Sequence, residues 1–296
     1  MGRAPAHPVV VDADRAPDYA GLLERAPAVL VRGDAATALS EFPAGRVQTV
    51  VTSPPYWSLR DYGIAGQIGL EGSVDEFLKS LVKVFDQVWR VLRDDGTLWL
   101  NIGDSYTSGG RTWRAPDRKN PARGMEVRPP TPDGLKPKDL VGIPWRLALA
   151  LQAAGWYLRA DIVWYKPNCQ PESVRDRPTR SHEFVFLLTK SERYRYNLDA
   201  VPGPNGRRLR TVWDINTRAR SDAHFAAFPP GLVENCIRLG TSGGDLVLDP
   251  FAGSGTTGEV AARLGRAFVG VELNPDYLAM AERRIAAASV EGAGGP

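Results

Sequence analysis

Asp249-Pro250-Phe251-Ala252-Gly253-Ser254-Gly255-Thr256-Thr257 is the stretch of sequence that decides the fold. It follows the apolar run Asp245–Leu248, predicted as a strand, and leads into a helix predicted over Thr256–Leu264. The two glycines let the backbone turn tightly and approach a ligand without a Cβ in the way. Because open α/β sheets bind their ligands outside the carboxyl ends of the strands, this turn is predicted to line a ligand site.

The end of the next predicted strand, Ala267–Val271, carries an acid, Glu272. A carboxylate in that place can accept hydrogen bonds from ribose hydroxyls, as in dinucleotide folds. The spacing of Gly253, Gly255 and Gly258 also matches the G-x-G-x-x-G pattern of a dinucleotide turn. The turn alone therefore leaves a dinucleotide ligand open, and it leaves open that the glycines serve only a tight turn.

Strands and helices alternate along the chain, which predicts an α/β fold with a mostly parallel sheet and helices on both faces. Strands are predicted over Ala28–Arg32, Arg46–Thr52, Thr97–Ile102, Tyr157–Tyr165 and Glu183–Thr189, the last two as antiparallel neighbours. Helices are predicted over Val74–Leu92, with Ser73 as N-cap, and over Pro144–Ala154, Pro230–Leu239 and Asp276–Ala288. Residues 1–27 are interpreted as a poorly ordered lead-in with a short helix, and 28–296 as one catalytic domain with insertions at about 107–137 and 168–220.

The composition is that of a globular protein. Of the 296 residues, 43% are hydrophobic, and no apolar run is long enough to span a membrane. The N-terminus lacks a basic stretch followed by a long apolar run, so no signal peptide is expected. The two cysteines form no CxxC pattern and the three histidines show no ligand spacing, which predicts a cytoplasmic protein with no metal site.

Positive charge is concentrated in the two insertions. The formal net charge is only +3, but Ser105–Pro137 holds seven Lys/Arg against three acids, and Lys166–Asp222 holds twelve against seven. This distribution suits a polyanionic partner. Solvated basic loops would have the same composition, so charge alone leaves nucleic acid open.

A second motif, Thr52-Ser53-Pro54-Pro55-Tyr56-Trp57, ends the strand Arg46–Thr52, because consecutive prolines cannot donate ladder hydrogen bonds. Its residues suit methylation of the exocyclic amine of a base, whose lone pair is delocalised into the ring. Oxygens of Ser53 and Pro54 that accept both amine hydrogens would favour a pyramidal nitrogen with its lone pair aimed at a methyl donor. The prolines hold both acceptors in place, and Tyr56 offers a flat face for a base pulled out of the helix. A proline-rich strand end with buried aromatic residues is the plainer interpretation.

Together the two motifs resemble those of the amino-methylating DNA methyltransferases of the beta type. In that circularly permuted family the catalytic S/D/N-P-P-Y/F/W motif precedes the cofactor motif F-x-G-x-G, as TSPPYW at 52–57 precedes FAGSG at 251–255 here. The resemblance covers most of the chain and includes NIGDSY at 101–106, DIVWYKPN at 161–168 and HEFVFLLTK at 182–190. It implies a Rossmann-like methyltransferase fold, S-adenosyl-L-methionine as cofactor and double-stranded DNA as substrate.

The resemblance also assigns roles to single residues. The residues that match the catalytic motif are Ser53, Pro54, Pro55 and Tyr56. The residues that match the cofactor site are Asp34, Phe228, Pro229, Asp249, Phe251, Gly253, Gly255, Thr256, Thr257 and Glu272. Among these, Glu272 resembles the ribose-binding acid and Asp34 the residue near the adenine amine, while the two threonines would bind a carboxylate at the helix start.

The first residue of the catalytic motif favours one base. Ser53 resembles the cytosine-N4 enzymes, whereas aspartate is commoner in the adenine-N6 enzymes, which remain the alternative. Methylation of cytosine C5 needs a cysteine thiolate, usually after proline, and both cysteines here follow asparagine. Two more distant alternatives are a dinucleotide-dependent oxidoreductase, which leaves Ser53–Trp57 unexplained, and a non-enzymatic DNA-binding protein, which needs no cofactor loop.

Sequence recognition is assigned to the basic insertions, because phosphate contacts position a protein on DNA and arginine commonly reads guanine. The arginines predicted to contact DNA are Arg175, Arg177, Arg207, Arg208 and Arg210. The family further allows a companion restriction endonuclease acting on the same site, and either a monomer or a homodimer.

Overall fold

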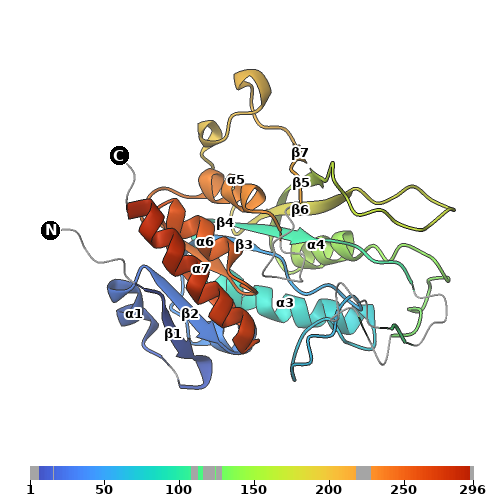
Figure 1. The fold of residues 1–296 in the computed structure, drawn as a ribbon, viewed down its shortest axis with the longest axis horizontal. Helices are drawn as coiled ribbons and strands as arrows, with labels where there is room; N and C mark the ends of the chain where they lie inside the picture. The colour runs from blue at the N-terminus through green and yellow to red at the C-terminus, as the bar shows by residue number, and fades with distance from the viewer. Residues whose placement is uncertain are drawn as a thin grey trace.

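The computed structural model describes residues 7–15, 17–107, 113–115, 124, 129–217 and 228–293. These residues form a nine-stranded sheet in the order β1-β2-β9-β8-β3-β4-β6-β5-β7, with helices on both faces (Figure 1). The strands are β1 (Val9–Asp12), β2 (Ala28–Arg32), β3 (Val47–Thr52), β4 (Leu92–Ile102), β5 (Tyr157–Tyr165), β6 (His182–Thr189), β7 (Val212–Asp214), β8 (Leu246–Asp249) and β9 (Ala267–Glu272). The helices are α1 (Tyr19–Arg25), α2 (Ala35–Ser40), α3 (Val74–Val91), α4 (Ile143–Ala153), α5 (Pro230–Gly240), α6 (Thr256–Arg263) and α7 (Pro275–Ala293).

Strand directions confirm the predicted α/β class. All pairs are parallel except those of β6, which runs antiparallel to β4 and to β5. The antiparallel pairing of the strands predicted over Tyr157–Tyr165 and Glu183–Thr189 is therefore confirmed. An antiparallel strand is common in large sheets that are otherwise parallel, and the crossovers between parallel strands place helices on both faces.

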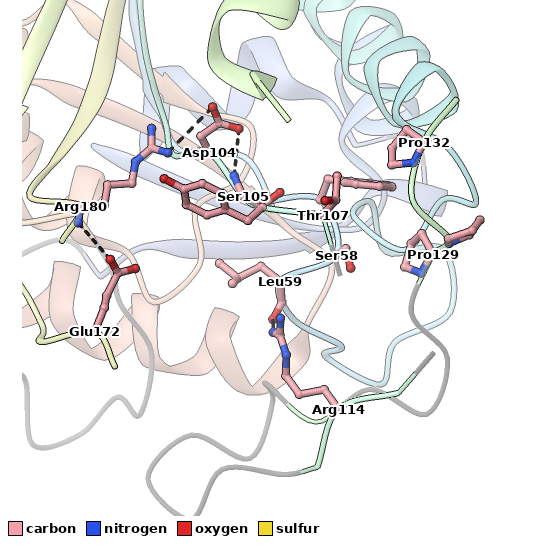
Figure 2. A pocket seen from close by; sticks show the side chains of 13 residues that line it. Ser58, Leu59, Asp104, Ser105, Thr107, Arg114, Pro129, Pro132, Glu172 and Arg180 are labelled. Atoms are coloured by element: carbon pink, nitrogen blue, oxygen red, sulfur yellow. Dashed lines mark hydrogen bonds and ion pairs between the residues drawn. The ribbon is translucent and has the colours of Figure 1, made fainter. Parts of the chain in front are cut away.

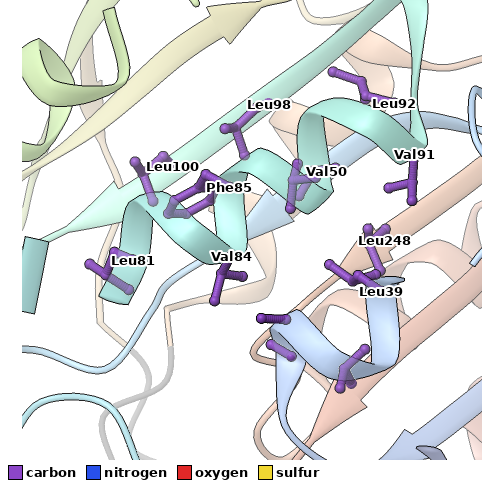
Figure 3. Close-up of a cluster of buried hydrophobic side chains, with 14 of the residues drawn as sticks. Leu39, Val50, Leu81, Val84, Phe85, Val91, Leu92, Leu98, Leu100 and Leu248 are labelled. Atoms are coloured by element: carbon purple, nitrogen blue, oxygen red, sulfur yellow. The ribbon is translucent and has the colours of Figure 1, made fainter. Parts of the chain in front are cut away.

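Both faces of the sheet are buried, so neighbouring residues of one strand belong to different cores. In β4, Leu98 and Leu100 pack in the core that includes α2, α3 and α4, while Trp99 between them packs in the core that includes α5, α6 and α7. Figure 3 shows the first core, where Phe85 of α3 lies over Leu98 and Leu100. Successive side chains of a strand point to opposite faces, which is why these strands are continuous apolar runs rather than alternating ones.

Helix α3 shows how the sequence positions its own elements. It begins after Ser73, whose hydroxyl accepts from the Glu76 backbone N–H (3.2 Å), while the Glu76 carboxylate accepts from the Ser73 N–H (3.2 Å). This reciprocal capping box confirms the predicted N-cap. The helix then presents seven buried apolar side chains to the sheet and ends at Val91, one residue before its predicted end.

Two segments differ from their predictions. The segment interpreted as a lead-in contains the short helix expected there, α1, but it also supplies β1, which pairs with β2 along its whole length, from Val9↔Val29 to Asp12↔Arg32. The second basic insertion supplies β7, which pairs with β5 and buries Trp213. Both are short edge strands of three or four residues, below the length at which alternation is informative, and pairing with a longer strand stabilises them. In the first insertion, at about 107–137, residues 108–112, 116–123 and 125–128 lie outside the described residues.

Candidate active site

The two sequence motifs meet at the carboxyl ends of two inner strands of the sheet. Strands β3 and β8 are parallel neighbours, with Thr49 opposite Val247 and Val50 opposite Leu248. The loops that follow them, 52–57 and 249–257, therefore leave the sheet side by side. A direct contact joins the two loops, because the Thr52 hydroxyl donates to the Asp249 carboxylate at 2.7 Å across 197 positions of sequence.

Asp249 is the buried centre of this junction, with 1% of its surface exposed. One carboxylate oxygen accepts from Thr52 Oγ1 (2.7 Å) and from the Phe251 N–H (3.0 Å), and the other accepts from Thr257 Oγ1 (2.6 Å). Burial raises the pKa of Asp249 to about 6, and the hydrogen bonds from Thr257 and Thr52 oppose that rise. The side chains of Asp249 and Thr257, both predicted as cofactor-binding residues, are buried beneath the loop and hold it to the end of β3.

The glycine turn directly contacts Glu272, the acid that is predicted to bind a ribose. The Gly253 N–H donates to one oxygen of the Glu272 carboxylate (2.7 Å), and the Asn274 N–H donates to the other (2.8 Å). Burial raises the pKa of Glu272. Gly255 has φ +85°, and a Cβ there would lie 2.7 Å from the Ala281 Cα, so only glycine lets the turn close against α7. The tight turn is thus required by the backbone conformation and by the packing of the next helix.

The carboxyl ends of β2, β9 and β8 together fit a ligand that contains a nucleoside. A Cβ added at Gly253 would point into open space, with no atom nearer than the Phe251 carbonyl oxygen at 3.9 Å. The exposed Asp34 caps α2, where its Oδ1 accepts from the Thr37 N–H and Oγ1 (both 2.9 Å). Because β2 pairs with β9 up to Arg32↔Glu272, Asp34 follows the strand next to that of Glu272. Carboxylates in these places can accept from ribose hydroxyls and from an adenine amine.

The remaining predicted cofactor residues are mainly part of the packing. Phe228 packs against the core of α5–α7, and Pro229 is buried as the N-cap of α5. Phe251 is half-buried against the core of α2–α4. Thr256 is buried at the first position of α6, where the free backbone N–H groups of a helix start can bind an anion. Across the described part of the chain, no group of three or more His, Cys, Asp or Glu residues is placed to hold a metal ion.

A cluster of polar side chains surrounds the catalytic motif. The Ser53 hydroxyl lies 3.4 Å from that of Tyr56, which in turn donates to the Glu183 carboxylate at 2.7 Å. Lys166 forms a salt bridge with the other oxygen of Glu183, and the side chains of these two residues are only 15% and 17% exposed. The Asn101 amide nitrogen donates to the same Glu183 oxygen as Tyr56, at 3.2 Å. Burial, and next the charge of Glu183, raise the pKa of Tyr56 well above its ordinary value.

Sequence reasoning did not single out Asn101, Lys166 or Glu183. Each lies in a segment that carried the family resemblance, NIGDSY, DIVWYKPN or HEFVFLLTK. The pairing of β6 with both β4 and β5 is what brings these residues beside Tyr56. The available signal in the sequence was a polar residue at the end of each of three predicted strands. Only the order of the strands in the sheet shows that these residues lie together.

A pocket of about 270 Å³ adjoins the catalytic motif without containing Ser53 or Tyr56 (Figure 2). It is lined by Trp57, Ser58, Leu59, Asp104, Ser105, Tyr106, Thr107, Arg114, Pro129, Pro130, Pro132, Glu172 and Arg180. Its acidic groups bind neighbours within the chain. Asp104 accepts from the backbone N–H groups of Gly142 and Ile143 at the start of α4, and Glu172 accepts from the Arg180 N–H at 3.0 Å. These contacts hold the surrounding loops together.

The predicted DNA-contacting arginines divide into two groups. Arg177 donates through both terminal nitrogens to the Glu172 carboxylate (2.7 and 3.2 Å), and its guanidinium lies 3.9 Å from the centre of the Tyr106 ring. That side chain is committed to holding the loop after β5. The arginines that are exposed are Arg175, Arg207, Arg208 and Arg210.

The sequence matches known proteins over most of its length. A family model described as DNA methylase matches residues 47–283. The Type II methyltransferase M.Cfr9I of Citrobacter freundii is 60% identical, over 89% of this chain and 89% of its own. The Type II methyltransferase M.SmaI of Serratia marcescens is 56% identical, over 86% of this chain and 90% of its own.

Solved structures share the fold. A DNA modification methylase of Thermus thermophilus, in complex with S-adenosyl-L-methionine, superposes with a TM-score of 0.62 at 28% identity, over 88% of this chain and 93% of its own. The PvuII DNA methyltransferase, described as cytosine-N4-specific, superposes with a TM-score of 0.66 at 22% identity, over 91% of this chain and 93% of its own. At that lower identity the likeness concerns the fold.

Proposed function

The chain belongs to the DNA methylase family, and we propose on that premise that it methylates the exocyclic N4 of cytosine at a specific site in double-stranded DNA. The enzyme class is Type II DNA methyltransferase, and the cofactor is S-adenosyl-L-methionine. The observation that carries the choice of base is Ser53, the first residue of the catalytic motif, which directly follows β3, the parallel neighbour of the strand that leads into the glycine turn.

The roles of the chain's own groups follow from this placement. Ser53 Oγ and the Pro54 carbonyl oxygen are acceptors, suited to bind the two hydrogens of an amine and to leave its lone pair free. The turn at Gly253 and the Glu272 carboxylate would hold the nucleoside part of the cofactor, which supplies a methyl group already activated on a sulfonium sulfur. Orienting two reactants in this way lowers the barrier through proximity. No nucleophilic side chain is needed.

The cysteines support methylation of an amine over methylation of cytosine C5. Cys236 lies in α5 with 1% of its surface exposed, and burial raises the pKa of its thiol, which disfavours the thiolate. Cys169 lies in the loop after β5, where its N–H donates to the Lys166 carbonyl. Neither follows a proline, and a C5 mechanism needs a positioned thiolate.

The DNA contacts are part of the proposal. Reaching the amine requires a flipped base and hence a held, distorted duplex. The exposed arginines Arg175, Arg207, Arg208 and Arg210 can neutralise phosphates, and some of them can read base edges. The Type II names of the relatives support a restriction-modification role with a companion endonuclease. A cytoplasmic location and a monomer or homodimer stay predictions. In the described residues no helix is both long and apolar enough to cross a membrane.

Product analysis tests the base. Double-stranded DNA is incubated with the protein and labelled S-adenosyl-L-methionine, digested to nucleosides and resolved by mass. We expect N4-methylcytosine. A product that is only N6-methyladenine would overturn the base and keep the amine mechanism, whereas 5-methylcytosine would overturn both.

Replacing Ser53 by alanine tests the site. A positioned polar group of this kind is worth roughly 100- to 1,000-fold in the rate of the chemical step. The Ser53→Ala enzyme should lose that much in single-turnover rate and keep its affinity for S-adenosyl-L-methionine, measured by calorimetry. A single-turnover rate equal to that of the wild type would remove Ser53 from the mechanism.

A further inference from the structure

The hydrogen bonds around Tyr56 run in one direction. A carboxylate accepts and cannot donate, so the 2.7 Å contact with Glu183 requires Tyr56 to be the donor. Asn101 presents a second acceptor, since its Oδ1 lies 3.5 Å from the same hydroxyl while its nitrogen donates to Glu183. The single hydroxyl hydrogen of Tyr56 therefore points toward Glu183. Its oxygen is left to accept.

Ser53 lies on the accepting side of Tyr56. Its Oγ donates toward the Tyr56 oxygen across 3.4 Å. That separation exceeds the usual O–H···O distance of about 2.5–3.0 Å, and hydrogen bonds of active sites commonly shorten once substrate binds. A serine hydroxyl has one hydrogen and two lone pairs. With the hydrogen directed at Tyr56, both lone pairs of Ser53 remain available to another donor.

We propose that Glu183 and Tyr56 are positioning residues that fix the polarity of the Ser53 hydroxyl, so that Ser53 accepts from the target amine and does not donate to it. The inference rests on the proposed methylation of an exocyclic amine. A serine that donated would bind the nitrogen lone pair, which is the pair that must attack the methyl group. Glu183 can only accept, so Tyr56 donates to Glu183 and Ser53 donates to Tyr56. This series of hydrogen bonds leaves Ser53 no hydrogen to donate to the amine.

The surroundings hold this chain of hydrogen bonds in place. Lys166 pairs with the second oxygen of Glu183, and its ammonium lies 4.2 Å from the centre of the Trp164 ring. A Cβ on Gly103 would lie 2.7 Å from Cε2 of Tyr56 and 3.2 Å from Cδ of Glu183, so glycine lets the two side chains close together. Since burial and the charge of Glu183 raise the pKa of Tyr56, the phenol keeps its hydrogen at neutral pH.

Two variants break the chain at different points. Tyr56→Phe keeps the ring and the Lys166–Glu183 salt bridge but removes the hydroxyl. Glu183→Gln keeps the shape but offers an amide that can donate to Tyr56 and reverse the polarity. Each should lower the single-turnover rate on plasmid DNA by about 10- to 100-fold, the equivalent of one hydrogen bond to a charged group. Dissociation constants for S-adenosyl-L-methionine and for DNA should stay within about twofold, because a polarity change acts on the chemical step.

The single-turnover rate of the double variant distinguishes the proposal from a purely structural role of the two residues. Both changes interrupt one chain, so Tyr56→Phe/Glu183→Gln should be no slower than the slower single variant. Glu192→Gln is the matched control, since Glu192 follows β6 with its side chain 75% exposed, and it should keep the wild-type rate. Independent losses that multiply in the double variant would overturn the proposal.

A wild-type single-turnover rate in Tyr56→Phe would also overturn it. If Glu183→Gln fails to fold because Lys166 loses its carboxylate, Tyr56→Phe alone decides, since it leaves that salt bridge intact. The outcome is separable from the base assignment. Wild-type product analysis that returns N6-methyladenine refutes cytosine as target and leaves the polarity of Ser53 standing, whereas an unimpaired Tyr56→Phe enzyme refutes the polarity and leaves the base standing.

Discussion

Replacing Asp249 by asparagine should change how the stability of the protein depends on pH. The substitution keeps the shape of the side chain and two of its contacts, since the remaining oxygen can still accept from Thr52 and from the Phe251 N–H. The new amide faces Thr257, whose hydroxyl can turn its hydrogen to the Val51 carbonyl oxygen at 3.4 Å. The variant therefore removes a buried charge with little change in packing.

The magnitude follows from the pKa of the carboxyl. Burial raises the pKa of Asp249 from 3.8 to about 6. Because one pKa unit corresponds to about 1.4 kcal/mol, ionising this group costs roughly 3 kcal/mol more in the folded protein than in the unfolded chain. Between those two pKa values the folded protein binds more protons than the unfolded chain, so its free energy of unfolding falls as the pH rises. Asparagine has no such dependence.

Urea unfolding of both proteins at about pH 4, 5, 6 and 7 measures this effect, because subtracting the two curves removes the titration of the groups they share. The free energy of unfolding of the wild type, relative to that of Asp249→Asn, should fall by most of the roughly 3 kcal/mol between the lowest and the highest pH. If the difference in free energy of unfolding between the two proteins stays constant from about pH 4 to about pH 7, burial does not make the ionisation of Asp249 costly.

The other predictions concern the cofactor turn and the DNA contacts. Glu272→Gln should weaken S-adenosyl-L-methionine binding by about 10-fold in calorimetry, through one lost charged hydrogen bond, and unchanged affinity would remove Glu272 from the site. Gly255→Ala should lower the free energy of unfolding by about 2–4 kcal/mol in urea, because a left-handed φ is strained for alanine and its Cβ meets the Ala281 backbone; a variant as stable as wild type would contradict the packing. Arg208→Ala should weaken DNA binding and lower by about one the slope of the logarithm of the binding constant against the logarithm of the salt concentration. Arg177→Ala should lower stability and leave that slope unchanged. Equal slopes in the two variants would refute this contrast.

The elements predicted from the sequence are those whose signals are local. The strand Leu246–Asp249, the glycine turn and helix α6 follow one another within a short stretch, and each carries its own signal in apolar run, glycine or helical spacing. The capping box of Ser73 and Glu76 is local in the same way. Short edge strands carry a weaker signal, such as the three valines of Val9–Asp12. Val9–Asp12 forms a strand because β2 lies beside it, and no pattern in four residues could report that neighbour.

The candidate site shows the same division. Ser53, Tyr56 and Glu272 were singled out because their motifs have a chemical meaning when read along the chain. The same motifs also drew in Asp249 and Thr257, whose side chains the fold turns inward to bind each other. Residue type indicates what each group can do, whereas the fold decides which side chains are buried against each other.

The sequence by itself determined the fold class, the order of the two motifs and the residue types at the reaction centre, because these depend on local patterns and on motif chemistry. Only the tertiary structure decided which groups act together. Strand order places β8 beside β3 and β6 between β4 and β5, and through those neighbours Thr52 meets Asp249 and Tyr56 meets Glu183. The reason is physical: hydrogen bonds need contact within about 3 Å, and residues far apart in a chain reach that distance only when the sheet brings their strands together.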